Sequence, residues 1–148
     1  MNKLLTTTAL SLLLMSLASV SYGQFDFEQT KRLAEQGNPN GQFVLGLMYD
    51  NGEGVPENDA EAVRWYRLAA EQGYARAQSD LGFMYSNGEG VPQNNVRAYI
   101  WYSVAAAQGN ETARTNRDII SERLTPDQLA RGQDIATRCF ESDYQDCE

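Results

Sequence analysis

Few side chains in this sequence are suited to chemistry. Its 148 residues include no histidine, the usual general base near neutral pH and the commonest metal ligand. The only cysteines, Cys139 and Cys147, are too few for a structural zinc site. No serine stands three residues before a lysine, a spacing that penicillin-binding enzymes use. Because no catalytic set of residues can be assembled, we expect a protein that is not an enzyme and has no cofactor or metal site.

Two short glycine loops, Gly52-x-Gly54 and Gly88-x-Gly90, contain part of a phosphate-binding pattern. A dinucleotide-binding fingerprint needs a third glycine and a preceding strand, and no strand is expected here. A calcium loop that begins at Asp50 would need oxygen ligands at alternate positions, where this chain has glycines. We therefore expect both loops to be structural turns.

The charge balance is acidic, with 12 Lys plus Arg against 20 Asp plus Glu and a formal net charge of −8. Nucleic-acid binding depends on clustered basic side chains that neutralise phosphates, and the sequence has no such cluster. We therefore expect no nucleic-acid partner. The hydrophobic content of 42% favours a folded domain over a disordered chain.

The N-terminus has the pattern of a signal peptide. A short positive segment, Met1–Lys3, precedes residues 4–20, which carry no charge and include the apolar run 10–15. Ser21-Tyr22-Gly23 then offers small residues at the two positions that a signal peptidase recognises. We expect residues 1–23 to be cleaved after Gly23, which leaves a periplasmic or secreted protein without a stable membrane anchor. The alternative is an uncleaved anchor helix, because the uncharged run approaches the length of a short transmembrane span.

The two cysteines lie close together near the C-terminus. In an exported chain, an even and local pair favours a structural disulfide between Cys139 and Cys147. Their spacing is too wide for a CxxC redox motif. Free thiols or an intermolecular bridge are the alternatives.

The middle of the chain repeats with a period of 36 residues. Residues 41–76 and 77–112 are identical at 19 of 36 aligned positions. Partial copies flank these two units, since residues 34–37 recur as 70–73, and the segment after 112 lacks the glycine loop. Divergent end units are typical of stacked repeats, because the outer face of the last unit meets water.

Each unit has the apolar spacing of paired helices. In Ala62–Ala70 the apolar residues follow an i, i+3, i+4, i+7, i+8 pattern, which predicts one buried helical stripe. Asn58, with Glu61 three residues on, resembles a capping box at the start of this helix, and Gly73 is expected to end it. A preceding helix near residues 41–50 would pair with it across the glycine loop.

The repeat pattern divides the mature chain into five segments. These are an N-terminal half-repeat or capping helix (24–40), repeat 1 (41–76), repeat 2 (77–112), C-terminal capping helices (113–140) and a polar tail (141–148). The Trp65-Tyr66 and Trp101-Tyr102 pairs lie on the predicted apolar stripes. We therefore expect them to pack between helices, and a sugar-stacking platform is the alternative.

The repeated blocks are similar to a known family. The pattern Leu45-Gly46-x-x-Tyr49, Gly52-x-Gly54-Val55-Pro56 and Ala62-x-x-Trp65-Tyr66-x-x-Ala69-Ala70-x-x-Gly73 resembles the Sel-1-like repeat (SLR), a relative of the tetratricopeptide repeat. The copy over residues 81–109 matches equally well. The resemblance implies an all-α fold, an α-α superhelix or right-handed solenoid of helix pairs with helical end caps. It also implies a role in scaffolding or regulation through protein contacts.

The resemblance further implies where a partner binds. In such solenoids the first helix of each repeat lines the concave surface. The outward positions that flank the Leu-Gly-x-x-Tyr motif are Asn40, Phe43, Leu47, Asp50, Arg76, Ser79, Phe83 and Ser86. Phe43, Leu47 and Phe83 would supply apolar anchors on that face. The alternative is that Phe43 and Leu47 pack against the N-terminal half-repeat and Phe83 packs between repeats.

These observations lead to one functional hypothesis. We expect a monomeric, non-catalytic adaptor or regulator in the cell envelope that binds another protein or peptide segment on its concave face. A different class is a cell-wall ligand binder or enzyme, since some cysteine-rich relatives are described as penicillin-binding or β-lactamase-like. This chain lacks their cysteine pair in every repeat. A third class is a structural subunit that self-associates through an end of the array.

Overall fold

The described part of the chain is entirely helical. The computed structural model describes residues 26–147, and this range forms α-helices and no strand. The helices are α1 (Phe27–Glu35), α2 (Pro39–Asn51), α3 (Asp59–Ala70), α4 (Ala75–Asn87), α5 (Asn95–Ala107), α6 (Glu111–Ser121) and α7 (Pro126–Glu141). The predicted signal peptide lies outside the described residues. Within residues 26–147, none of the helices combines the length and apolar character that crossing a membrane requires.

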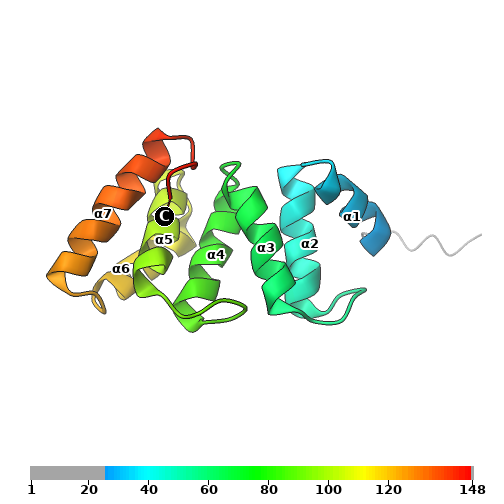
Figure 1. Ribbon diagram of the computed structural model, residues 1–148, viewed down its shortest axis with the longest axis horizontal. Coiled ribbons are helices and arrows are strands. Elements are labelled where there is room, and N and C mark those ends of the chain that lie inside the picture. Colours follow the sequence, from blue (N-terminus) through cyan, green and yellow to red (C-terminus); the bar gives the residue numbers. More distant parts are fainter. Residues whose placement is uncertain (1–25, 148) are drawn as a thin grey trace, which may run out of the picture.

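The helices stack in chain order. Each helix from α1 to α6 packs against its neighbour in the chain, and α7 returns to pack on α5. Figure 1 shows the helices arranged along the long axis of the molecule, with α1 at one end and α7 at the other. The prediction of an all-α array of helix pairs is confirmed.

The 36-residue period is visible in the helix boundaries. The first helices α2 and α4 run over Pro39–Asn51 and Ala75–Asn87, which are the same bounds shifted by one period. The second helices α3 and α5 start at Asp59 and Asn95, again one period apart. Helix α6 begins at Glu111, one period after α4. The C-terminal segment, described from sequence as a partial copy and as capping helices, therefore begins with a helix equivalent to α2 and α4.

Local signals explain where these helices begin and end. The Asn58 side chain accepts a hydrogen bond from the Glu61 N–H at the start of α3. A reciprocal capping box forms at Thr125 and Gln128, at the start of α7. Gly52 ends α2 with a left-handed φ of 67°, a conformation that glycine adopts without a steric cost. Helix α3 ends at Ala70, shortly before the glycine that was expected to terminate it.

The core is built from the repeated aromatic pairs. All four Trp and Tyr residues of the Trp65-Tyr66 and Trp101-Tyr102 pairs are buried, so none forms an exposed stacking platform. The Tyr102 ring lies directly against Gly82 of α4, where an added Cβ would sit only 2.8 Å from the ring. Glycine in the Leu-Gly motif therefore allows the second helix to approach the first closely.

Buried glutamines connect each unit to the one before it. Gln78 of α4 donates a hydrogen bond to the Ala70 carbonyl at the end of α3, at 3.0 Å. It also accepts one at 2.6 Å from Gln108, which follows α5. Gln42 makes the same pair of bonds one period earlier. Each glutamine thus adds a second hydrogen bond to a helix-end carbonyl that already accepts the N–H of the glycine three residues on.

The C-terminal segment folds back onto the array. Cys139 and Cys147 are joined by a disulfide, and both are buried. Gln145 donates a hydrogen bond to the Glu71 carbonyl at 3.0 Å, and the Tyr144 ring covers Gly73. Figure 1 shows this segment passing from the end of α7 back across α5. The segment described from sequence as a polar tail therefore packs against the turn between α3 and α4.

Candidate partner-binding site

The eight positions named from the sequence differ in exposure. Asn40, Arg76 and Phe83 are exposed, whereas Leu47 and Asp50 are half-buried. The remaining positions are buried, namely Phe43, Ser79 and Ser86. Only the exposed and half-buried members can contact a partner without rearrangement.

Phe43 packs inside the array. It is only 7% exposed, and its ring lies 5.1 Å from the ring of Tyr74 and 6.0 Å from that of Tyr66, between centroids. The Tyr74 hydroxyl donates a hydrogen bond to the Asn40 side chain at 3.0 Å, which holds the ring over Phe43. Phe43 is thus a core residue, and the rings it packs on belong to α3 and the turn after it, not to the N-terminal half-repeat named in the packing alternative.

Three apolar side chains recur at one position of the first helices. Phe83 in α4 is 45% exposed, and Ile119 in α6, one period later, is 48% exposed. Leu47 in α2, one period earlier, is half-buried. Equivalent positions of stacked units lie on the same face of an array. We call Leu47, Phe83 and Ile119 the apolar ladder.

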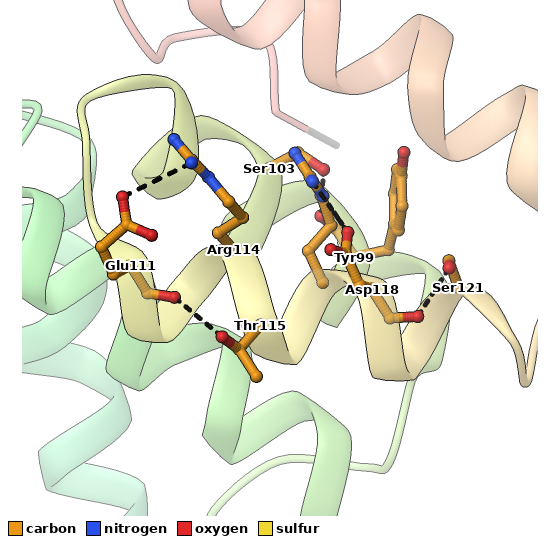
Figure 2. Close-up of polar contacts among 8 residues, drawn as sticks. Tyr99, Ser103, Glu111, Arg114, Thr115, Asp118 and Ser121 are labelled. Carbon is orange, nitrogen blue, oxygen red and sulfur yellow. Dashed lines mark hydrogen bonds and ion pairs between the residues drawn. The ribbon is translucent and has the colours of Figure 1, made fainter.

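Ile119 was missed because the third unit was treated as a cap. Adding the 36-residue period to Phe83 would have found it. Figure 2 shows polar side chains of α6 bonded to other groups of the same helix. Glu111 pairs with Arg114 at 3.4 Å, and Ser121 donates to the Asp118 carbonyl at 2.7 Å. These polar side chains thus find partners within the helix, and Ile119 is a large exposed apolar side chain of α6.

Two carboxylates lie beside the ladder at the junction between the first two units. The Tyr66 hydroxyl, from α3, donates a hydrogen bond to Asp50 of α2 at 3.0 Å. Asp80 of α4 approaches the same group from the next unit, close enough for its charge to act on both Tyr66 and Asp50. Asp80 was not identified from the sequence, because its equivalents one period away are Val44 and Asn116.

The electrostatics of this junction are unfavourable for Asp80. Burial raises the pKa of the Asp80 carboxyl from 3.8 to about 6, the Asp50 charge adds to the rise, and Arg76 opposes it. Burial also raises the pKa of the Tyr66 hydroxyl, with further contributions from Asp50 and Asp80. Asp50 and Asp80 are therefore two half-buried carboxylates at one junction, and the effect of Arg76 on the pKa of Asp80 is smaller than that of burial and of the Asp50 charge.

The next junction has neutral side chains at the two positions that carry carboxylates in the first. There the Tyr102 hydroxyl lies beside Ser86 and Asn116, which occupy the positions of Asp50 and Asp80 one period on. Burial raises the pKa of Tyr102, and hydrogen bonding to Ser86 and Asn116 opposes the rise. The Asp80 charge also raises the pKa of Tyr102 and that of Arg123 lowers it, so the second junction lacks a carboxylate pair of its own but still feels Asp80.

A separate cavity of about 350 Å³ lies between α5 and α7. Its walls include Val104, Ala136 and Phe140, and Arg117 of α6 also lines it. None of the ladder residues contributes to it. Across residues 26–147, the His, Cys, Asp and Glu side chains form no group of three or more that could hold a metal ion.

Comparison with known proteins gives two consecutive family matches. Residues 39–74 and 75–110 each match the Sel1 repeat. Their bounds coincide with the starts of α2, α4 and α6. Among curated proteins, none matches the chain.

Two solved structures are similar to this chain. A Sel1 repeat protein from Oxalobacter formigenes is 41% identical over 62% of this chain and 68% of that chain, with a TM-score of 0.60. A protective antigen of uropathogenic Escherichia coli strains, which displays an SLR fold, is 32% identical with a TM-score of 0.75. That match covers 80% of this chain, and this chain spans 25% of the antigen structure. These likenesses support the α-α superhelix expected from the sequence.

Proposed function

Because the chain belongs to the Sel1 repeat family, we propose that it is a non-catalytic adaptor that binds a segment of a partner protein on its apolar ladder. Proteins built from Sel1 repeats are generally protein-interaction scaffolds. The observation that carries the proposal is the recurrence of apolar residues at one position of the helices α2, α4 and α6, where Leu47 is half-buried and Phe83 and Ile119 are exposed.

The ladder has the composition of a binding surface. Phe83 and Ile119 are nearly half exposed, and a partner that covered them would gain the burial of their apolar surface. Apolar anchors beside polar and charged groups are typical of grooves that bind peptide segments. The half-buried carboxylates at the first junction supply such polar neighbours.

The experiment is affinity capture with the mature chain on a cross-linked cell-envelope fraction, using Phe83→Glu as the test variant. The matched control is Leu68→Glu, since Leu68 is a 38% exposed apolar residue of the second helix α3. A partner that is recovered by the wild type and Leu68→Glu, and lost with Phe83→Glu, supports the proposal. Equal recovery by all three proteins would contradict binding on the ladder.

We also propose that the adaptor acts in the cell envelope as a monomer. The envelope location is supported by the N-terminal pattern of a charged start, an uncharged run and Ser21-Tyr22-Gly23, which is typical of a signal peptide. Mass spectrometry of the protein recovered from the periplasm should give a chain that begins at Gln24. Recovery of the protein with residues 1–23 attached and embedded in the membrane would contradict cleavage.

A further inference from the structure

We propose that the partner segment carries a lysine or arginine, which lies between Asp50 and Asp80, next to an apolar side chain that packs on Phe83. This inference rests on the proposed function and specifies the chemistry of its partner. It assigns a basic and apolar peptide, not an acidic one, to the first-helix face.

The two carboxylates lie next to the ladder on the same helix faces. Asp50 follows Leu47 by three residues in α2, and Asp80 precedes Phe83 by three residues in α4. Residues three apart on a helix are surface neighbours, with Cβ atoms about 5–6 Å apart. A peptide side chain that reaches the carboxylates therefore belongs to a residue close to the one that packs on Phe83.

Charge complementarity decides the sign of that side chain. Asp50 accepts the hydrogen bond from Tyr66. Asp80 is partly buried, and the negative charge of Asp50 acts on it. Arg76, in the same helix as Asp80, lowers the pKa of Asp80, but burial and the Asp50 charge outweigh it. A cation placed between the two carboxylates would form charge-assisted hydrogen bonds and remove their repulsion. The formal net charge of −8 for the whole chain further favours encounter with a basic segment.

The second junction differs from the first in the side chains around its tyrosine, so we expect a basic side chain to bind at the first junction. Ser86 and Asn116 surround Tyr102 where Asp50 and Asp80 surround Tyr66. A partner thus meets the Asp50 and Asp80 carboxylates at the first junction and the neutral Ser86 and Asn116 at the second, where Arg123 opposes the charge of Asp80 on Tyr102. The segment is therefore bound in a fixed direction, with its basic residue toward α2.

The second junction also supplies the test variant. Replacing Asp50→Ser together with Asp80→Asn copies the residues that accompany Tyr102, so the Tyr66 hydroxyl keeps polar neighbours. The probe is a phage-displayed library of random peptides of about 12 residues, which span roughly 40 Å when extended. It is selected against the wild type, against this double variant and against Phe83→Glu, each checked by its thermal unfolding.

The wild type should select peptides that pair Lys or Arg with a nearby apolar residue. Removing the basic side chain of the best peptide should weaken binding to the wild type about tenfold, which is about 1.4 kcal/mol. The same peptide change should have little effect on binding to the double variant. Selection of apolar peptides without any basic preference would overturn this inference and leave the adaptor function standing. If the wild type enriched no peptide more strongly than Phe83→Glu does, both this inference and the proposed adaptor function would be overturned.

Discussion

The Tyr66 hydroxyl lies 3.0 Å from the Asp50 carboxylate and donates a hydrogen bond to it across the α2–α3 pair. Tyr66 is a fully buried core residue, yet its polar end reaches the junction where Asp80 of the next unit also arrives. One side chain of the repeat motif thus links the packed core to a charged surface group. The properties of that junction can be tested through stability and through binding.

The first prediction concerns the pH dependence of stability. Folding raises the pKa of the Asp80 carboxyl to about 6, from 3.8 for an aspartate that is free in water. The folded state therefore binds more protons than the unfolded state between about pH 4 and 6, and stability falls as the pH rises through this window. Asp80→Asn cannot ionise, so it should raise the free energy of unfolding at pH 7.5 by about 1–2 kcal/mol and change it little at pH 4.

Chemical denaturation of Asp80→Asn at both pH values measures this difference. The control is Glu57→Gln, because Glu57 is an exposed acid in the loop between α2 and α3. It should leave stability nearly unchanged at both pH values. A loss of stability in Asp80→Asn that is equal at pH 4 and pH 7.5 would show that the carboxylate is not strained by burial.

The second prediction concerns the close approach of α5 to α4. A Cβ at Gly82 would lie 2.8 Å from the Tyr102 ring, which is buried and cannot easily move. Overpacking of this kind costs about 1–3 kcal/mol, and the better helix propensity of alanine returns up to about 1 kcal/mol. Gly82→Ala should therefore destabilise the protein by about 1–2 kcal/mol.

A double-mutant cycle isolates the cause of this loss. In a Tyr102→Leu background the ring is absent, so Gly82→Ala should become neutral or slightly stabilising. Urea denaturation of the four proteins gives the coupling between the two positions. If Gly82→Ala costs the same in both backgrounds, the steric explanation is wrong.

The third prediction concerns the C-terminal disulfide. Replacing both Cys139 and Cys147 by alanine releases the loop that holds Tyr144 on Gly73 and Gln145 on the Glu71 carbonyl. The chain-entropy model gives a loss of about 2.6 kcal/mol for so short a loop. Thermal unfolding measures the loss, and amide hydrogen exchange should increase at the turn between α3 and α4. Unchanged exchange there would show that the tail stays docked without the bond.

The repeat architecture could be predicted from the sequence because the period and the caps are local signals. Asn58 and Thr125 mark helix starts by their own hydrogen bonds, and the 36-residue shift carries each boundary to the next unit. The burial of Trp65-Tyr66 follows from the apolar stripe in the same way. Local patterns of this kind need no knowledge of distant contacts.

The binding face was harder to predict because exposure depends on contacts between units. Phe43 and Phe83 were both expected to point outward, but they occupy different positions of the repeat, equivalent to Ser79 and Leu47. The Tyr74 ring packs on Phe43 and buries it. Asp80 gave no signal, because its environment is set by Asp50 and Tyr66 of the preceding unit. The folded-back tail likewise depends on contacts with Glu71 and Gly73, which lie far from it in the chain.

The most direct test of the central claim is photo-crosslinking at single positions of the ladder in living cells. A photoreactive phenylalanine analogue replaces Phe83 or Ile119 in separate variants, and Leu68 of α3 in the control, since all three side chains are exposed and apolar. The account predicts the same crosslinked partner protein from the Phe83 and Ile119 variants and none from the Leu68 variant. A partner that crosslinks from Leu68 alone, or no adduct at either ladder position, would contradict binding on the ladder.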